Sequence, residues 1–180
     1  MKPAHLPGDL PTEAVVERAL RVDHAGEFGA VRIYQGQLAV LEGTASADAV
    51  RHMAEQEQRH LDAFDQLLTE RRVRPTVLSP VWGAAGFALG AATALLGEKA
   101  AMACTEAVEE VIDDHYRRQS ERLSAAEPDL ASKLEEFRAE EIEHRDTARE
   151  HGAREAPGYP LLKTGVRTAT RLAIWLSERV

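Results

Sequence analysis

Two segments of the sequence carry a glutamate followed three positions later by a histidine: Glu57 with His60, and Glu141 with His144. In a helix these two side chains leave the same face one turn apart, so that a carboxylate oxygen and an imidazole nitrogen can reach one metal ion. A single pair of this kind also occurs by chance on the solvated face of a charged helix. The occurrence of two such pairs in one chain is therefore what indicates a metal site.

A further glutamate precedes each pair, at a similar distance and in an apolar helical segment. Glu27 stands 30 positions before Glu57, and Glu109 stands 32 positions before Glu141. Four glutamates and two histidines are the ligand set of a carboxylate-bridged site for two metal ions inside a helical bundle. All six residues are therefore candidate metal ligands.

Composition predicts an all-α protein. Ala, Leu, Glu and Arg dominate the 180 residues, whereas β-branched and aromatic residues are sparse. The length fits a single domain over residues 1–180, large enough to bury a sizeable core.

The one cysteine, Cys104, excludes an internal disulfide and a zinc finger, and its apolar surroundings indicate a buried, inert thiol.

Turn signals divide the chain into two long helical hairpins. We expect four helices, at 12–42, 47–72, 98–123 and 129–152. Thr12 is placed to cap the first helix, and Pro128 suits the first position of the fourth. At a rise of about 1.5 Å per residue, each leading glutamate lies within about a turn of the depth of its partner. Two such hairpins, packed antiparallel, would bring the six candidate ligands into one layer at mid-bundle.

The spacing does not choose between neighbouring acids. Glu106 and Glu110 flank Glu109 and remain alternatives to it, whereas the Glu-x-x-His spacing favours Glu141 over its neighbours. Other residues on the ligand face suggest supporting roles. Asp23 and Asp113 are candidate acceptors for the free imidazole N–H of a ligand.

Tyr116, two turns after Glu109, can donate a hydrogen bond to a substrate or pack in the core with a satisfied hydroxyl.

The crossover between the hairpins, residues 75–97, carries no charged side chain. Pro80 and three glycines interrupt it, which favours a buried crossover helix over a transmembrane span. The spacing of Gly86 and Gly90 allows another backbone to approach closely, within the bundle or in a dimer. We expect its large apolar side chains to form a surface for a membrane or an apolar substrate: Val81, Trp82, Phe87, Leu89, Leu95 and Leu96.

The tail at 161–180 has the pattern of an amphipathic helix. Its apolar stripe consists of Leu162, Val166, Ala169, Ala173 and Leu176. Lys163, Arg167 and Arg171 flank this stripe, and Trp175 lies near its end. This composition is typical of a helix on an anionic membrane surface, and a fifth helix packed on the bundle is the alternative.

The net charge and the N-terminal sequence limit which partners and which cellular compartment we expect. A net charge of −8 argues against a nucleic-acid partner. Residues 1–11 form a short lead, expected to be flexible, without the pattern of a signal or transit peptide. Together with the tail, this is compatible with a bacterial-type protein at the cytoplasmic face of the inner membrane.

Several motifs occur in order along nearly the whole chain: Asp23-His24-Ala25-Gly26-Glu27, Arg32-Ile33-Tyr34, Glu57-Gln58-x-His60, Val108-Glu109-Glu110, Glu141-Ile142-Glu143-His144 and Leu176-Ser177-Glu178-Arg179. Together they resemble the demethoxyubiquinone hydroxylase family. The resemblance implies a ferritin-like bundle with two iron ions, bound peripherally to a membrane. It also implies that dioxygen hydroxylates the demethoxyubiquinone ring in the penultimate step of ubiquinone biosynthesis, with a polyprenyl quinone as substrate.

The resemblance also carries residue roles. It makes the six candidates the iron ligands, and so selects Glu109 among its neighbours, with Glu57 and Glu141 as bridging carboxylates. Arg18, Tyr116 and Arg171 match positions linked to electron transfer from a reduced nicotinamide, NADH. The spacing does not support Arg18, which lies half a turn off the face of Glu27.

The chain has no nucleotide-binding glycine loop, so NADH binds atypically or a partner protein supplies the electrons. A homodimer and a ubiquinone-biosynthesis partner are both compatible with the sequence. Two other function classes also stay open. One is a ferritin-like protein that oxidises iron or scavenges peroxide, and the other is a membrane adaptor without bound metal.

Overall fold

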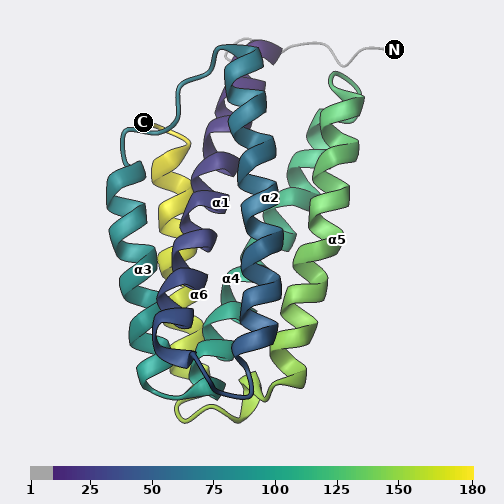
Figure 1. The fold of residues 1–180 in the computed structure, drawn as a ribbon. Coiled ribbons are helices and arrows are strands. Elements are labelled where there is room, and N and C mark those ends of the chain that lie inside the picture. Colours follow the sequence, from purple (N-terminus) through teal and green to yellow (C-terminus); the bar gives the residue numbers. More distant parts are fainter. Residues whose placement is uncertain (1–9) are drawn as a thin grey trace.

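The computed structural model describes residues 10–180, which form a bundle of α-helices without a β-strand (Figure 1). The elements are α1 (Thr12–Leu41), α2 (Ala47–Arg71), α3 (Ser79–Leu95), α4 (Glu98–Leu123), α5 (Pro128–Glu150), the short 3-10 helix η1 (Ala153–Glu155) and α6 (Tyr159–Ser177). The prediction of an all-α bundle is confirmed, while the ferritin-like relationship remains a prediction. Most of the predicted lead, residues 1–9, lies outside the described residues.

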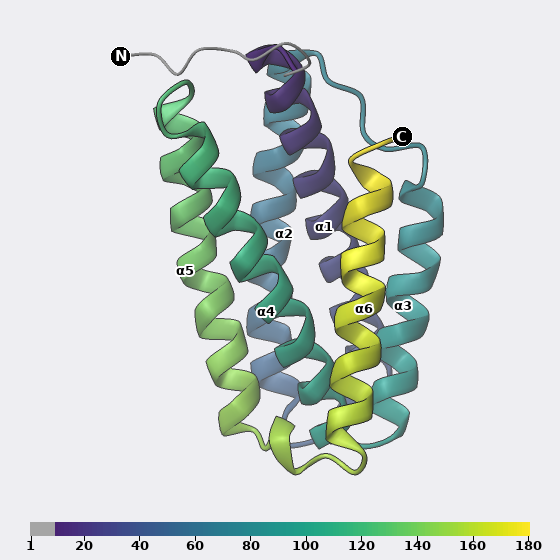
Figure 2. The ribbon, with the colours of Figure 1, turned by 180° about the vertical axis from the view of Figure 1, so that it is seen from behind.

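The helices pair as two hairpins, α1 with α2 and α4 with α5. Their turns lie at opposite ends of the bundle, so that α1 and α4 run antiparallel (Figures 1 and 2). The charge-free crossover forms α3, which packs along α1, and the tail forms α6, which packs along α4. No helix in the described part of the chain has the length and apolar character needed to cross a membrane.

The helix ends agree with the turn signals except at the start of α1. The predicted cap was wrong, because Thr12 is already helical, Pro11 occupies the cap position and no side chain caps the helix. Pro128 begins α5 as expected, since proline lacks the N–H that a first helical residue would leave unpaired.

Glycines allow α3 to pack closely on α1. A Cβ atom on Gly90 would overlap the carbonyl oxygen of Ile33, and one on Gly36 would overlap that of Phe87. The small-residue spacing therefore serves contact between helices of the same chain.

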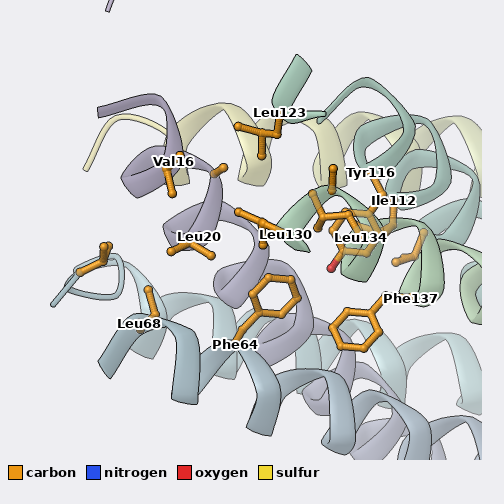
Figure 3. Close-up of a cluster of buried hydrophobic side chains, with 14 of the residues drawn as sticks. Val16, Leu20, Phe64, Leu68, Ile112, Tyr116, Leu123, Leu130, Leu134 and Phe137 are labelled. Carbon is orange, nitrogen blue, oxygen red and sulfur yellow. The ribbon is translucent and has the colours of Figure 1, made fainter. Parts of the chain in front are cut away.

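Two apolar clusters fill the bundle on either side of its middle. The first, shown in Figure 3, includes Phe64, Leu134 and Phe137 and lies towards the turn between α4 and α5. The second lies towards the other end and includes Met53 and a run of alanines at the start of α4. Cys104 is buried as expected, and burial raises the pKa of its thiol to about 12, which disfavours the reactive thiolate form.

Candidate metal centre

The six predicted ligands meet in one layer, here called the ligand layer. They come from four helices: Glu27 from α1, Glu57 and His60 from α2, Glu109 from α4, and Glu141 and His144 from α5. None is more than 2% exposed. The hairpin geometry explains the convergence, since each hairpin returns its Glu-x-x-His pair to the depth of its leading glutamate.

The ligand layer divides into two groups of four side chains. In each group one ligand atom per residue lies within 4.8 Å of all the others. The first group is Glu27, Glu57, His60 and Glu141, and the second is Glu57, Glu109, Glu141 and His144. Glu57 and Glu141 belong to both groups, which is the arrangement that two bridging carboxylates require.

Both imidazoles turn the same nitrogen towards the carboxylates. Nδ1 of His60 lies 3.2 Å from Glu141 and 3.5 Å from Glu27. Nδ1 of His144 lies 3.1 Å from Glu57 and 3.3 Å from Glu141. The two Nε2 atoms are therefore left for partners outside the ligand layer.

Burial and crowding perturb the protonation of the ligand layer. Burial raises the pKa of Glu27 well above its ordinary value, and the charge of Glu57 adds to the effect. Burial would lower the pKa of His60 and His144, but contacts to Glu141 and a second glutamate raise each to about 11. Burial would raise the pKa of Glu141, yet the two imidazoles hold it at about 2. Protons on the imidazoles thus balance part of the carboxylate charge when no metal is bound.

Several buried atoms of the ligand layer have no hydrogen-bond partner. These atoms are both carboxylate oxygens of Glu57 and of Glu141, Nδ1 of His60 and of His144, and Nε2 of His60. A buried polar atom without a partner is costly, and a pair of divalent cations would satisfy the four oxygens and the two Nδ1 atoms, which face one another. The residues therefore fit a pair of metal ions, and oxygen and imidazole donors without thiolate suit iron or manganese.

Two buried tyrosines hold the leading glutamates. Tyr116 donates a hydrogen bond to Glu27, and Tyr34 donates one to Glu109 over 2.8 Å. We considered Tyr116 either as a hydrogen-bond donor to the substrate or as a core residue with a satisfied hydroxyl. In the structure it is buried and its hydroxyl is satisfied by Glu27. Sequence reasoning missed Tyr34, although it follows Glu27 by the same seven positions that separate Tyr116 from Glu109.

The predicted partners of the imidazole N–H groups were wrong. Asp23 contacts His115 at 3.2 Å, and Asp113 accepts a hydrogen bond from Arg138. The groups that face the two Nε2 atoms come instead from the residues before Glu57 and Glu141. Gln56 Oε1 lies 3.1 Å from His144 Nε2, and Glu140 Oε2 lies 3.3 Å from His60 Nε2.

The neighbours of Glu109 point away from the ligand layer towards basic side chains. They form the α4–α6 ion-pair cluster, which consists of Glu106, Glu110, Arg149, Arg154, Lys163 and Arg167. Glu106 accepts hydrogen bonds from Arg149 and Tyr159, both at 2.7 Å. Burial would raise the pKa of Glu106, but these donors lower it to about 2.

Two cations of the tail contact the bundle. Lys163 and Arg167 form ion pairs with Glu110, in agreement with the alternative of a fifth helix packed on the bundle. These pairs join α6 to α4. The apolar stripe itself packs inward at Val166, which is buried.

Arg18 and Arg171 line a surface pocket of about 490 Å³ between the start of α1, the end of α4 and the end of α6. Arg118 and Arg122 also line it, with Asp114 and Glu178 as its acids. His115 lines this pocket, whereas the next residue, Tyr116, does not. The structure thus brings the two predicted arginines together and places Tyr116 deeper, at the ligand layer.

An apolar pocket of about 150 Å³ lies between α1, α3 and α6. Trp82 and Leu89, which we expected on the surface, turn inward and line it, and Trp82 donates a hydrogen bond to Ser177. Gly26 and Ala30 line it as well, on the helix that carries Glu27.

The outer faces of α3 and α6, which lie side by side in Figure 2, carry exposed apolar side chains. On α3 and the loop after it these are Val81, Phe87, Leu95 and Leu96, and on α6 they are Leu161, Leu172 and Trp175.

Comparisons with known proteins identify the family of the chain. Residues 14–177 match the family described as ubiquinone biosynthesis protein COQ7. The 3-demethoxyubiquinol 3-hydroxylase of Rhodospirillum rubrum is 57% identical over 97% of this chain and 83% of its own length. The human mitochondrial NADPH-dependent 3-demethoxyubiquinone 3-hydroxylase is 49% identical, over 96% of this chain and 81% of its own length. The chain therefore belongs to the COQ7 family of ubiquinone biosynthesis proteins.

Proposed function

We propose that this protein is an oxygen-dependent di-iron monooxygenase that hydroxylates the ring of demethoxyubiquinol in ubiquinone biosynthesis. The ligand layer carries the proposal, because it gathers four buried glutamates and two buried histidines whose unpartnered atoms point at one another. The names of the relatives support the reaction and the substrate class.

Each group of four side chains would hold one ion, with Glu57 and Glu141 shared between them. Iron ions held there would supply the activation of dioxygen. The protein's own part is to orient the ligands and to exclude water from the site. Tyr34 and Tyr116 hold the leading glutamates, and the two apolar clusters above and below keep the layer dry. Such a site keeps electrostatic interactions strong.

The apolar pocket between α1, α3 and α6 is the proposed route for the quinol ring. Its walls include glycines and alanines next to Glu27, so it approaches the ligand layer from the side of α3 and α6. A polyprenyl tail needs an apolar path, and the exposed side chains of α3 and α6 could rest on a membrane. We therefore propose that the protein binds a membrane surface, and we keep the cytoplasmic face as the prediction made from the sequence.

Hydroxylation of the ring consumes two electrons and two protons, while the second oxygen atom leaves as water. Relatives named NADPH-dependent support a reduced nicotinamide as the donor. The pocket that Arg18 and Arg171 line is the proposed binding site, because its four arginines suit the phosphates of a dinucleotide.

The test is to incubate iron-loaded protein anaerobically with demethoxyubiquinone and NADH or NADPH, then to admit oxygen and identify the products. A hydroxylated quinone is expected, and it should disappear in His60→Ala and His144→Ala. Iron oxidation without conversion of the quinone, with any reductant, would contradict the substrate and favour a ferritin-like role.

A further inference from the structure

The two hairpins carry matching functional residues except at one position. Glu27, Tyr34, Glu57 and His60 of the first correspond to Glu109, Tyr116, Glu141 and His144 of the second. The residue before the shared glutamate differs, since it is Gln56 in the first hairpin and Glu140 in the second. The ligands of the two hairpins are thus nearly symmetric, whereas the residues next to the shared glutamates are not.

Each of these two residues reaches across to the other hairpin. Gln56 on α2 faces Nε2 of His144 on α5, and Glu140 on α5 faces Nε2 of His60 on α2. One imidazole is therefore backed by a neutral amide and the other by a carboxylate. Gln56 and His144 are in hydrogen-bond contact, whereas Glu140 lies within ion-pair distance of His60 Nε2, at 3.3 Å, without hydrogen-bond geometry. Glu140 therefore acts on His60 through its charge.

Glu140 also determines how the amide of Gln56 is oriented. Gln56 Nε2 donates to Glu140 Oε2 over 2.9 Å, and an ionised carboxylate accepts but does not donate. The Oε1 atom of Gln56 is therefore the one that faces His144, which must donate from Nε2 and keep Nδ1 for a metal. Arg59 also donates to Glu140 Oε2, at 3.1 Å, and holds it in place.

We propose that Gln56 and Glu140 are positioning residues that make the two metal positions unequal, with the position at His60 binding a divalent ion more tightly. A carboxylate behind a ligating imidazole raises its basicity more than an amide does, and such outer partners change metal affinity by roughly 10- to 100-fold. Arg59 offsets part of this charge, so we expect the lower end of that range. The inference rests on the proposed di-metal centre and adds an order of loading to it.

The test is an anaerobic titration of metal-free protein with Co²⁺, followed by calorimetry and by NMR of ¹⁵N-labelled histidines. The wild-type protein should bind two ions with constants that differ about 10-fold. The first equivalent should perturb the resonances of His60 before those of His144. Glu140→Gln should weaken the tighter site until the two constants nearly coincide.

The matched control exchanges the two residues, Gln56→Glu with Glu140→Gln. It conserves composition and charge, keeps an amide next to a carboxylate, and should make His144 the first imidazole perturbed. If Glu140→Gln does not fold, judged by circular dichroism, the order of perturbation in the wild-type protein alone decides. Two equal constants, or His144 first in the wild-type protein, would overturn the inequality while leaving the di-metal site. Fewer than two bound ions would overturn the proposed function as well.

Discussion

Glu106 and Glu109 are three positions apart on α4, yet they lie in opposite kinds of acidic site. Glu109 lies with the carboxylates of Glu57 and Glu141 in the ligand layer, and burial together with the charge of Glu141 raises its pKa well above the ordinary value. Glu106 faces Arg149, Arg154 and Lys163 in the α4–α6 ion-pair cluster. Both side chains are buried, and only their partners differ.

The difference shows what a buried carboxylate needs. In the α4–α6 ion-pair cluster the chain supplies the positive charge itself, so the site is complete without a ligand. In the ligand layer the chain supplies four carboxylates and two imidazoles, and several atoms remain without partners. The missing charge must come from protons or from metal ions, and only metal ions would satisfy the unpartnered atoms.

The largest expected effect concerns metal binding. At a free Fe²⁺ concentration 1,000 times the dissociation constant of a given metal position, the ion bound there should raise the free energy of unfolding by about 4 kcal/mol. Anaerobic denaturant titrations with and without Fe²⁺ measure this gain. Glu57→Gln should remove most of it, because this residue belongs to both ligand groups, whereas Glu106→Gln should retain it. An unchanged gain in Glu57→Gln would place the metal outside the ligand layer.

The next effect distinguishes glutamates that form ion pairs within the protein from glutamates that we propose bind metal. Glu106→Ala should lower the free energy of unfolding by about 2 kcal/mol, less than for a fully buried pair because its cationic partners are partly exposed. Chemical denaturation measures the loss, and metal analysis should still find two ions per chain. Glu110→Ala is the control with a smaller loss, since Glu110 is more exposed. Loss of metal from Glu106→Ala would blur the distinction between the two sites.

The two sites should also respond to opposite changes in pH. In metal-free protein the raised pKa values of His60 and His144, about 11 against an ordinary 6.5, mean that the folded state binds more protons in this window. Stability should therefore fall as the pH rises above about 6.5, by about 1.4 kcal/mol per pH unit for each imidazole and up to about 3 kcal/mol per pH unit for the two together. Denaturant titrations at several pH values test this, and bound metal should remove the alkaline loss.

The α4–α6 ion-pair cluster has the reverse sign. The pKa of Glu106 is lowered to about 2 from an ordinary 4.5, so its contribution is present above pH 4.5 and is lost as the pH falls towards 2. Glu106→Gln should reduce the acid sensitivity without changing the alkaline loss. Equal alkaline loss with and without metal would contradict protonated imidazoles in the metal-free layer.

The smallest expected effect concerns the tyrosines. Tyr34→Phe removes one hydrogen bond to Glu109 and should cost about 1 kcal/mol, with a similar loss for Tyr116→Phe at Glu27. Thermal unfolding of the two variants provides the comparison, and each should still bind two ions. A loss of several kcal/mol from one variant alone would show that the hairpins are not equivalent at this level.

Local patterns in the sequence were sufficient for the helices and for the candidate ligands. Gly43, Pro128 and the charge-free crossover mark where helices end, and three-residue spacing places a glutamate and a histidine on one face. Residues that act between helices could not be found this way. Helical phase placed Asp23 and Asp113 on the ligand face but could not show that His115 and Arg138 stand opposite them.

The same reason explains why Gln56, Glu140 and Tyr34 were missed as supporting residues. Their partners lie on the other hairpin, and only the packing of the bundle reveals them. Spacing along α4 likewise could not separate Glu109 from Glu106. The two side chains diverge because α5 and α6 present basic residues to one side of that helix only.

The most direct test of the central claim is X-ray diffraction from crystals of iron-loaded protein, with anomalous differences measured across the iron absorption edge. Two peaks are expected, one within each group of four side chains, with Glu57 and Glu141 between them. No peak in the ligand layer, or peaks only at surface carboxylates, would contradict the account.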